Sequence, residues 1–119
     1  MNHWQALRPH LPKLATKLDT YRPPLLRVVV DDVTVLVTVL PLSEALEAHS
    51  RFSGMPSLTL EDWLDEMLKK LERLYPYPSH SVEVHAQWPG NPPRLERMAR
   101  IRPIYPSTPR PQTLDVVQP

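Results

Sequence analysis

Proline is the residue that most constrains this chain, because the sequence contains sixteen prolines and only two glycines. Each proline fixes its own φ angle and has no backbone N–H to donate, so helices and strands must be short and must end near prolines. Scarce glycine leaves few positions for turns with positive φ. We therefore expect a stiff fold of short elements joined by extended connections, a habit that recurs in thermostable proteins.

The length and composition are those of one globular domain. The chain has 119 residues, of which 41% are hydrophobic and 23% charged, and this is enough for a single modest core. The absence of cysteine excludes a disulfide framework and thiolate zinc sites. A net charge of +1 gives no overall attraction to a polyanion.

No segment resembles a cleavable signal peptide or a run of about eighteen apolar residues that would cross a membrane. The expected location is therefore the cytoplasm, or a virion or other assembly of which this chain is a subunit.

Residues 25–42, LLRVVVDDVTVLVTVLPL, form the strongest strand pattern in the sequence, because β-branched residues dominate them. Asp31 and Asp32 divide the segment and predict a two-residue turn between antiparallel strands. Aspartate pairs suit such turns less well than Asn-Gly, so one long bulged strand stays open as an alternative. The register expected from the turn pairs Val30 with Val33 and Val28 with Val35.

Two short helices are predicted on either side of this segment. Leucines at helical spacing indicate a helix over 11–21, which begins near Pro12 and is stopped before the next proline pair. Ser43 is expected to cap a second helix that runs to about Phe52, with Gly54 just beyond its end.

The third helix has the clearest start signal. Thr59 opens the sequence TLED, which is typical of a capping box, and Leu58 with Trp63 has the spacing of a hydrophobic staple. Acidic residues fill its first half and basic residues its second, as the helix dipole favours. The predicted apolar stripe consists of Leu60, Leu64, Met67, Leu68, Leu71, Leu74 and Tyr75.

Residues 81–88, SVEVHAQW, alternate between apolar and polar side chains and predict a strand. The sequence PGNPP then forms a turn, and the chain is expected to return as a strand over 95–104. Residues 93–99 also have apolar side chains at helical spacing, so a helical turn there remains an alternative. The expected inward residues are Val82, Val84, Ala86 and Trp88, and the outward ones are Glu83, His85 and Gln87.

These elements predict an α+β fold with two β-hairpins in one antiparallel sheet and helices packed on one side of it. The predicted domain covers residues 1–105, and residues 106–119 form an extended, proline-rich C-terminal arm. Free in solution such an arm adopts polyproline-like backbone angles.

The sequence contains few of the motifs that indicate an enzyme. Two isolated glycines cannot build a phosphate-binding loop or a dinucleotide fingerprint, and no serine has a nucleophile motif. Glu83 and His85 share one strand face, where an acid–base pair or a metal is conceivable, and the i,i+4 carboxylates Glu61, Asp62, Asp65 and Glu66 could hold a hard cation. The acidic start of the third helix is explained by the helix dipole. We therefore assign no catalytic residue, no cofactor and no metal site.

The one local charge asymmetry is an arginine-rich stretch over 94–102, with Arg94, Arg97, Arg100 and Arg102 against Glu96. Together with Trp88 and Tyr105 it offers the cationic and aromatic groups that bind single-stranded nucleic acids. Arginine is equally enriched at protein interfaces. A small nucleic-acid-binding or regulatory protein is therefore the alternative function.

The arm ends in the apolar residues Leu114, Val116 and Val117, which a solvated tail does not need. Such a tip can add a strand to an exposed sheet edge, either of its own sheet or of a neighbouring chain. The leading interpretation is a non-enzymatic, protein-binding or structural subunit of a larger assembly, such as a virion or secretion apparatus, that docks through this arm on a protein partner or on further copies of itself. The expected partner-binding residues are Arg97, Arg100, Arg102, Tyr105, Leu114, Val116 and Val117.

Overall fold

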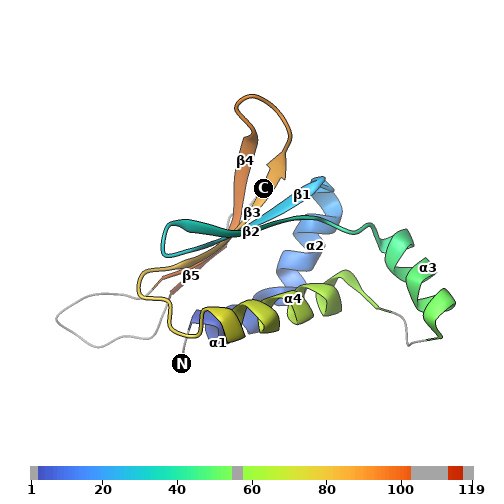
Figure 1. Ribbon diagram of the computed structural model, residues 1–119, viewed down its shortest axis with the longest axis horizontal. Coiled ribbons are helices and arrows are strands. Elements are labelled where there is room, and N and C mark those ends of the chain that lie inside the picture. The colour runs from blue at the N-terminus through green and yellow to red at the C-terminus, as the bar shows by residue number, and fades with distance from the viewer. Residues whose placement is uncertain (1–2, 55–57, 103–112, 117–119) are drawn as a thin grey trace.

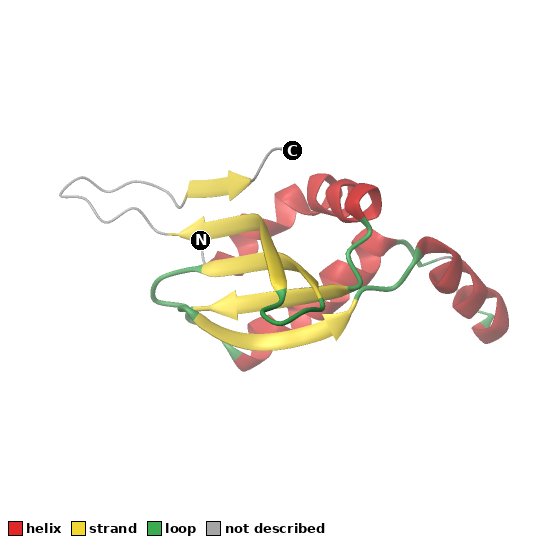
Figure 2. Cartoon of the chain, turned by 90° about the horizontal axis from the view of Figure 1, so that it is seen from above, coloured by secondary structure: helices red, strands yellow, loops and turns green. Residues whose placement is uncertain are grey.

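The predicted fold class is confirmed: an antiparallel sheet built from two hairpins packs against helices on one of its faces (Figure 1). The computed structural model describes residues 3–54, 58–102 and 113–116. The strands run in the spatial order β2-β1-β3-β4-β5, and Figure 2 shows the helices behind the sheet.

The helices are α1 (His3–Leu7), η1 (Arg8–His10), α2 (Leu11–Tyr21), α3 (Ser43–Ser53) and α4 (Leu60–Leu74). The strands are β1 (Leu25–Val30), β2 (Val33–Val39), β3 (Val82–Trp88), β4 (Arg94–Arg102) and β5 (Thr113–Val116).

The amino-terminal helices pack on the same side of the sheet as α4: α2 contacts both α4 and β4, and α1 contacts β4. The predicted helix over 11–21 is confirmed as α2, whose leucine stripe is buried and whose last residue is followed by Arg22 in a left-handed conformation. The short helix α1 was not predicted. Its Trp4 is only 1% exposed and donates a hydrogen bond from Nε1 to the carbonyl oxygen of Tyr75 over 2.7 Å. That bond ties the start of the chain to the end of α4.

The start of α4 matches the prediction from the sequence. The Thr59 hydroxyl accepts from the Asp62 backbone N–H at 3.1 Å, and the Asp62 carboxylate accepts from the Thr59 N–H at 3.3 Å. The predicted stripe was wrong at its end, because Leu74 is 69% exposed and Tyr75 is 38% exposed. Leu74 borders an open groove between α4 and β2 instead of the closed core.

Helix α3 ends as predicted, at Gly54 with φ 68°. The predicted cap was wrong, because Leu42 occupies the N-cap position and Ser43 is the first helical residue. The helix extends away from the rest of the molecule (Figure 1), and among its described residues Leu46 is buried.

The β1–β2 hairpin has the predicted two-residue turn, and the single-strand alternative is excluded. Asp31 and Asp32 both have positive φ angles, 51° and 66°, which a primed turn requires. Val30 pairs with Val33 as expected, but Val28 pairs with Leu36 and not with Val35. The predicted register was wrong there because Val35 is an extra residue, a β-bulge in β2.

In the β3–β4 hairpin, β4 is a strand from Arg94 onward. The return strand is therefore confirmed, and the alternative of a helical turn at 93–99 is excluded. The tip of the hairpin bends away from the helices (Figure 1). The expected faces hold for the inward core residues, but Trp88 is only half-buried, and Gln87 on the opposite face is buried. Gln87 is covered because it is hydrogen-bonded to Arg27 on β1.

The backbone of β5 pairs antiparallel with β4, with Leu114 opposite Ile101 and Val116 opposite Ala99. Of the two possibilities for the end of the chain, a strand on its own sheet is therefore the one observed. The predicted boundary after residue 105 lies outside the described residues, as does the predicted end of the return strand at 104.

No helix within the described ranges is long and apolar enough to cross a membrane.

Candidate functional site: the outer face of the sheet

The face of the sheet opposite the helices, here called the outer face, gathers most of the polar residues that the strands carry. The described helices leave this face uncovered, and the raised tip of the β3–β4 hairpin borders it (Figures 1 and 2). The pairing registers place six polar side chains there in adjacent rows: Arg27, Glu83, His85, Gln87, Arg97 and Arg100.

A β-bulge decides where two of the arginines lie. Side chains on a regular strand alternate between faces, so residues three positions apart point to opposite sides. In β4, Arg97 pairs with His85 while Ala99 pairs with Val84, which leaves Met98 as an extra residue. Arg97 and Arg100 consequently occupy the same face, opposite His85 and Glu83. Both arginine side chains are half-buried.

Arg27 brings a third guanidinium group to this face from the middle of a valine strand. Its Nε donates to Gln87 Oε1 at 2.7 Å, and its NH1 group donates to Thr34 Oγ1 at 3.1 Å. Because the neighbouring strands hold the guanidinium on two sides, little side-chain entropy is left to lose when a ligand binds it.

Glu83 and His85, which the sequence placed on one strand face, are in contact there. His85 Nε2 lies 3.1 Å from Glu83 Oε1, and the side chains are 18% and 14% exposed respectively. The other ring nitrogen, Nδ1, is buried and has no hydrogen-bond partner in the described part of the chain. No cluster of three metal-ligating side chains occurs among the described residues.

The tip of the β3–β4 hairpin carries a cation–π pair that the register places on the opposite face from Gln87. The Arg94 guanidinium lies over the Trp88 ring, 4.4 Å from its centroid, which is a cation–π contact. Arg94 also lies 3.7 Å from the Glu96 carboxylate. Arg102 is exposed at the other end of β4.

The structure therefore brings together some of the predicted partner-binding residues and not others. Arg97 and Arg100 share one row, and Arg102 follows at the end of the same strand. The backbones of Leu114 and Val116 lie beside β4. Tyr105 and Val117 lie outside the described residues.

The residues predicted from the sequence to form the site included neither Arg27 nor Gln87, although Gln87 was correctly placed on the outward side of its strand. A signal for Arg27 was present, since a lone charge in the run LLRVVV must reach either solvent or a polar partner.

Comparisons with known proteins returned nothing similar: no protein-family model, no curated protein and no solved structure matches this chain.

Proposed function

We propose that this protein is a non-enzymatic interaction subunit that docks an acidic surface of a protein partner on the outer face of its sheet. The observation that carries this proposal is the gathering of Arg27, Arg97 and Arg100 on one uncovered face. Guanidinium groups bind carboxylates through paired hydrogen bonds. The registers place two acidic positions beside the three arginines, Glu83 on β3 and Asp115 on β5, each opposite Arg100, so basic residues outnumber acidic ones there.

Partial burial supports a role in specific docking rather than general solubility. Arg97 and Arg100 are half-buried, and Arg27 is held by two hydrogen bonds. A partner carboxylate that reached these groups would bind in a partly desolvated site, where charge-assisted hydrogen bonds are stronger than at an open surface. Arginine contacts of this kind are frequent among the residues that dominate binding energy.

A protein partner fits this face better than a nucleic acid does. Sheet surfaces that bind single strands present aromatic rings on which bases stack. The strand registers put no tryptophan, tyrosine or phenylalanine among the described residues of the outer face. Trp88 lies on the opposite face of the hairpin, against Arg94.

The proline-rich segment 106–119 stays in the proposal as a second contact with a larger assembly. Its prolines restrict the backbone of the free chain. Binding therefore costs this segment less conformational entropy than it would cost a flexible one. Val117 belongs to this segment, and Tyr105 directly precedes it.

The test is affinity capture with the tagged full-length chain from cells of its native source, followed by mass spectrometry. We expect the double variant R97A/R100A to lose the protein that the wild type captures. The matched control is R51A/R73A, which removes two exposed arginines from α3 and α4 and should capture as the wild type does. Equal capture by R97A/R100A and the wild type would refute the proposal, as would equal loss in both double variants.

A further inference from the structure

We propose that two copies of this chain associate by pairing their β2 strands across a two-fold axis, which continues the sheet and brings the two α4 helices together. The contact is made by the edge formed by β2 and α4, which adjoins the outer face because Val37 pairs with Arg27. Three properties of this edge support the association.

The first property is an unprotected sheet edge. β2 pairs only with β1 and is the last strand on its side of the sheet (Figure 2). Exposed edges are normally protected by charged residues, proline or a covering element. The sequence of β2 is VTVLVTV, with no charge and no proline, and no other described strand extends the sheet beyond it. The opposite side of the sheet differs, because β5 covers β4.

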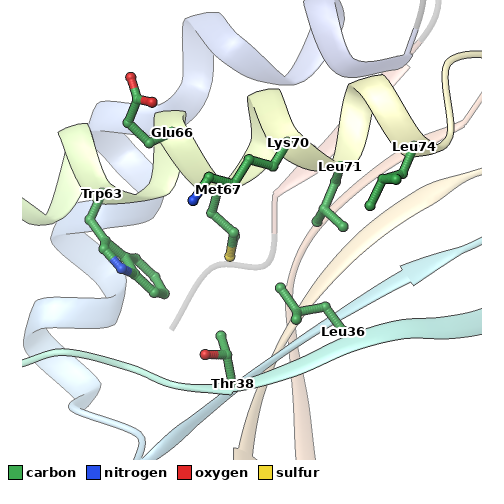
Figure 3. A pocket seen from close by; sticks show the side chains of 8 residues that line it. All are labelled: Leu36, Thr38, Trp63, Glu66, Met67, Lys70, Leu71 and Leu74. Carbon is green, nitrogen blue, oxygen red and sulfur yellow. The ribbon is translucent and has the colours of Figure 1, made fainter.

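The second property is the apolar surface that flanks this edge. Val33, Val37 and Val39 of β2 are 62%, 44% and 69% exposed. Behind the strand, a groove of about 360 Å³ separates β2 from α4. Figure 3 shows Met67 pointing from α4 toward the strand between Leu36 and Thr38. Val37 and Val39 lie on the outer face of β2, and the groove lies on its helix side. Exposed apolar groups on both sides of an edge strand favour an interaction there.

The third property is the charge pattern of the groove, which favours a second copy of this chain as the binding partner. The groove wall carries one acidic and one basic residue, Glu66 and Lys70, one helical turn apart on α4. A two-fold axis reverses the direction of the second α4, so that each Glu66 faces the Lys70 of the other copy. A two-fold interface must be complementary to itself. A groove with balanced opposite charges meets that requirement, whereas it gives no preference for a uniformly acidic or basic partner.

The bulge fixes the part of β2 that can pair. Val35 interrupts the regular strand, so the ladder between copies begins at Leu36. An antiparallel pairing centred on Val37 keeps facing residues on the same side of the sheet: Val37 opposite its own copy, and Leu36 opposite Thr38. In such a pair the two Val37 Cα atoms lie about 4.5–5.5 Å apart.

The test uses the full-length chain and its lack of cysteine. In sedimentation and light-scattering measurements the wild type is expected to have twice the 13.8 kDa mass of one chain. The V37C variant should form a disulfide-linked dimer under mild oxidation, because the expected Cα separation suits a disulfide. The control is L95C on β4, since Leu95 is 43% exposed and Val37 is 44% exposed. L95C should stay uncrosslinked at the same protein concentration.

A charge exchange on α4 tests the helix contact separately. E66K should weaken the dimer roughly tenfold, because two facing Glu–Lys pairs become repulsive. The double variant E66K/K70E restores opposite charges across the axis and should recover most of the affinity. Circular dichroism checks that each variant is folded.

A wild-type mass of one chain at every concentration up to about 1 mM would overturn the inference. Equal crosslinking of V37C and L95C would do so too, as would a double charge exchange that remained as weak as E66K.

Discussion

Arg27 Nε donates a hydrogen bond to Gln87 Oε1 over 2.7 Å, and this bond joins two strands whose residues are 60 positions apart in the chain. Gln87 is 9% exposed, so its carboxamide group is largely shielded from water. The Arg27 guanidinium replaces water as the hydrogen-bond donor to its oxygen. The pair therefore both fixes an arginine on the outer face and connects the first hairpin to the second.

Replacing Gln87 with leucine should lower the free energy of unfolding by about 1–3 kcal/mol, because the half-buried Arg27 Nε loses its acceptor. The measurement is urea denaturation of wild type, Q87L, R27M and Q87L/R27M. The double variant should lose less than the sum of the single losses, since it leaves neither Gln87 nor the Arg27 Nε without its partner in the other. Strictly additive losses would mean that the hydrogen bond contributes nothing.

The turn residue Asp31 should make stability depend on acid pH. Burial alone would raise the pKa of its carboxyl group, but hydrogen bonds from the backbone N–H groups of Ser79, His80 and Ser81, together with the Ser79 hydroxyl, outweigh it and lower the pKa to about 2. A carboxyl group whose pKa is lower in the folded state stabilises the fold above its ordinary pKa of 3.8. That contribution is lost as the pH falls toward 2.

The variant D31N should unfold more easily at pH 7, by about 1–2 kcal/mol, because an amide cannot accept all of these hydrogen bonds. Below pH 4 the difference between D31N and the wild type should shrink. D32N is the matched control, since Asp32 occupies the same turn and asparagine tolerates its positive φ. Denaturant titrations from pH 7 down to pH 3 measure all three proteins, and equal curves for D31N and D32N would contradict the role of Asp31.

The bulge residue Met98 is 1% exposed, whereas Met67 on α4 is only partly buried. M98A should therefore cost about 2–4 kcal/mol of unfolding free energy through the cavity it leaves, and M67A should cost clearly less. Thermal or urea unfolding of the two variants checks this order. M98A keeps the extra residue in β4, so the folded fraction should bind the partner as the wild type does.

Local patterns in the sequence predicted the elements that depend on neighbouring residues. The capping box at Thr59 and Asp62 and the two-residue turn at Asp31 and Asp32 were confirmed, because each needs only side chains and backbone within a few positions. The short helix α1 was not predicted. Trp4 holds it through a bond to Tyr75, which is 71 positions away, and such a long-range contact leaves no local signal.

The candidate site was predictable in part. The shared face of Glu83 and His85 follows from their spacing and was confirmed by their 3.1 Å contact. The two bulges were not predictable, since an extra residue such as Val35 or Met98 fits an apolar pattern equally well on a regular strand. The bulge at Met98 determines that Arg97 shares a face with Arg100. The arginine arrangement on which the proposed function rests therefore could not be predicted from the sequence and was found only in the structure.

Binding to two probes of equal charge tests the central claim most directly: a fluorescently labelled glutamate-rich peptide and a labelled oligothymidylate with the same number of negative charges. Fluorescence anisotropy at low salt should show tighter binding to the peptide by the wild type and by R51A/R73A, and roughly tenfold or greater loss in R97A/R100A. Tighter binding to the oligonucleotide, with a steep fall as salt rises, would contradict the account and favour the nucleic-acid alternative.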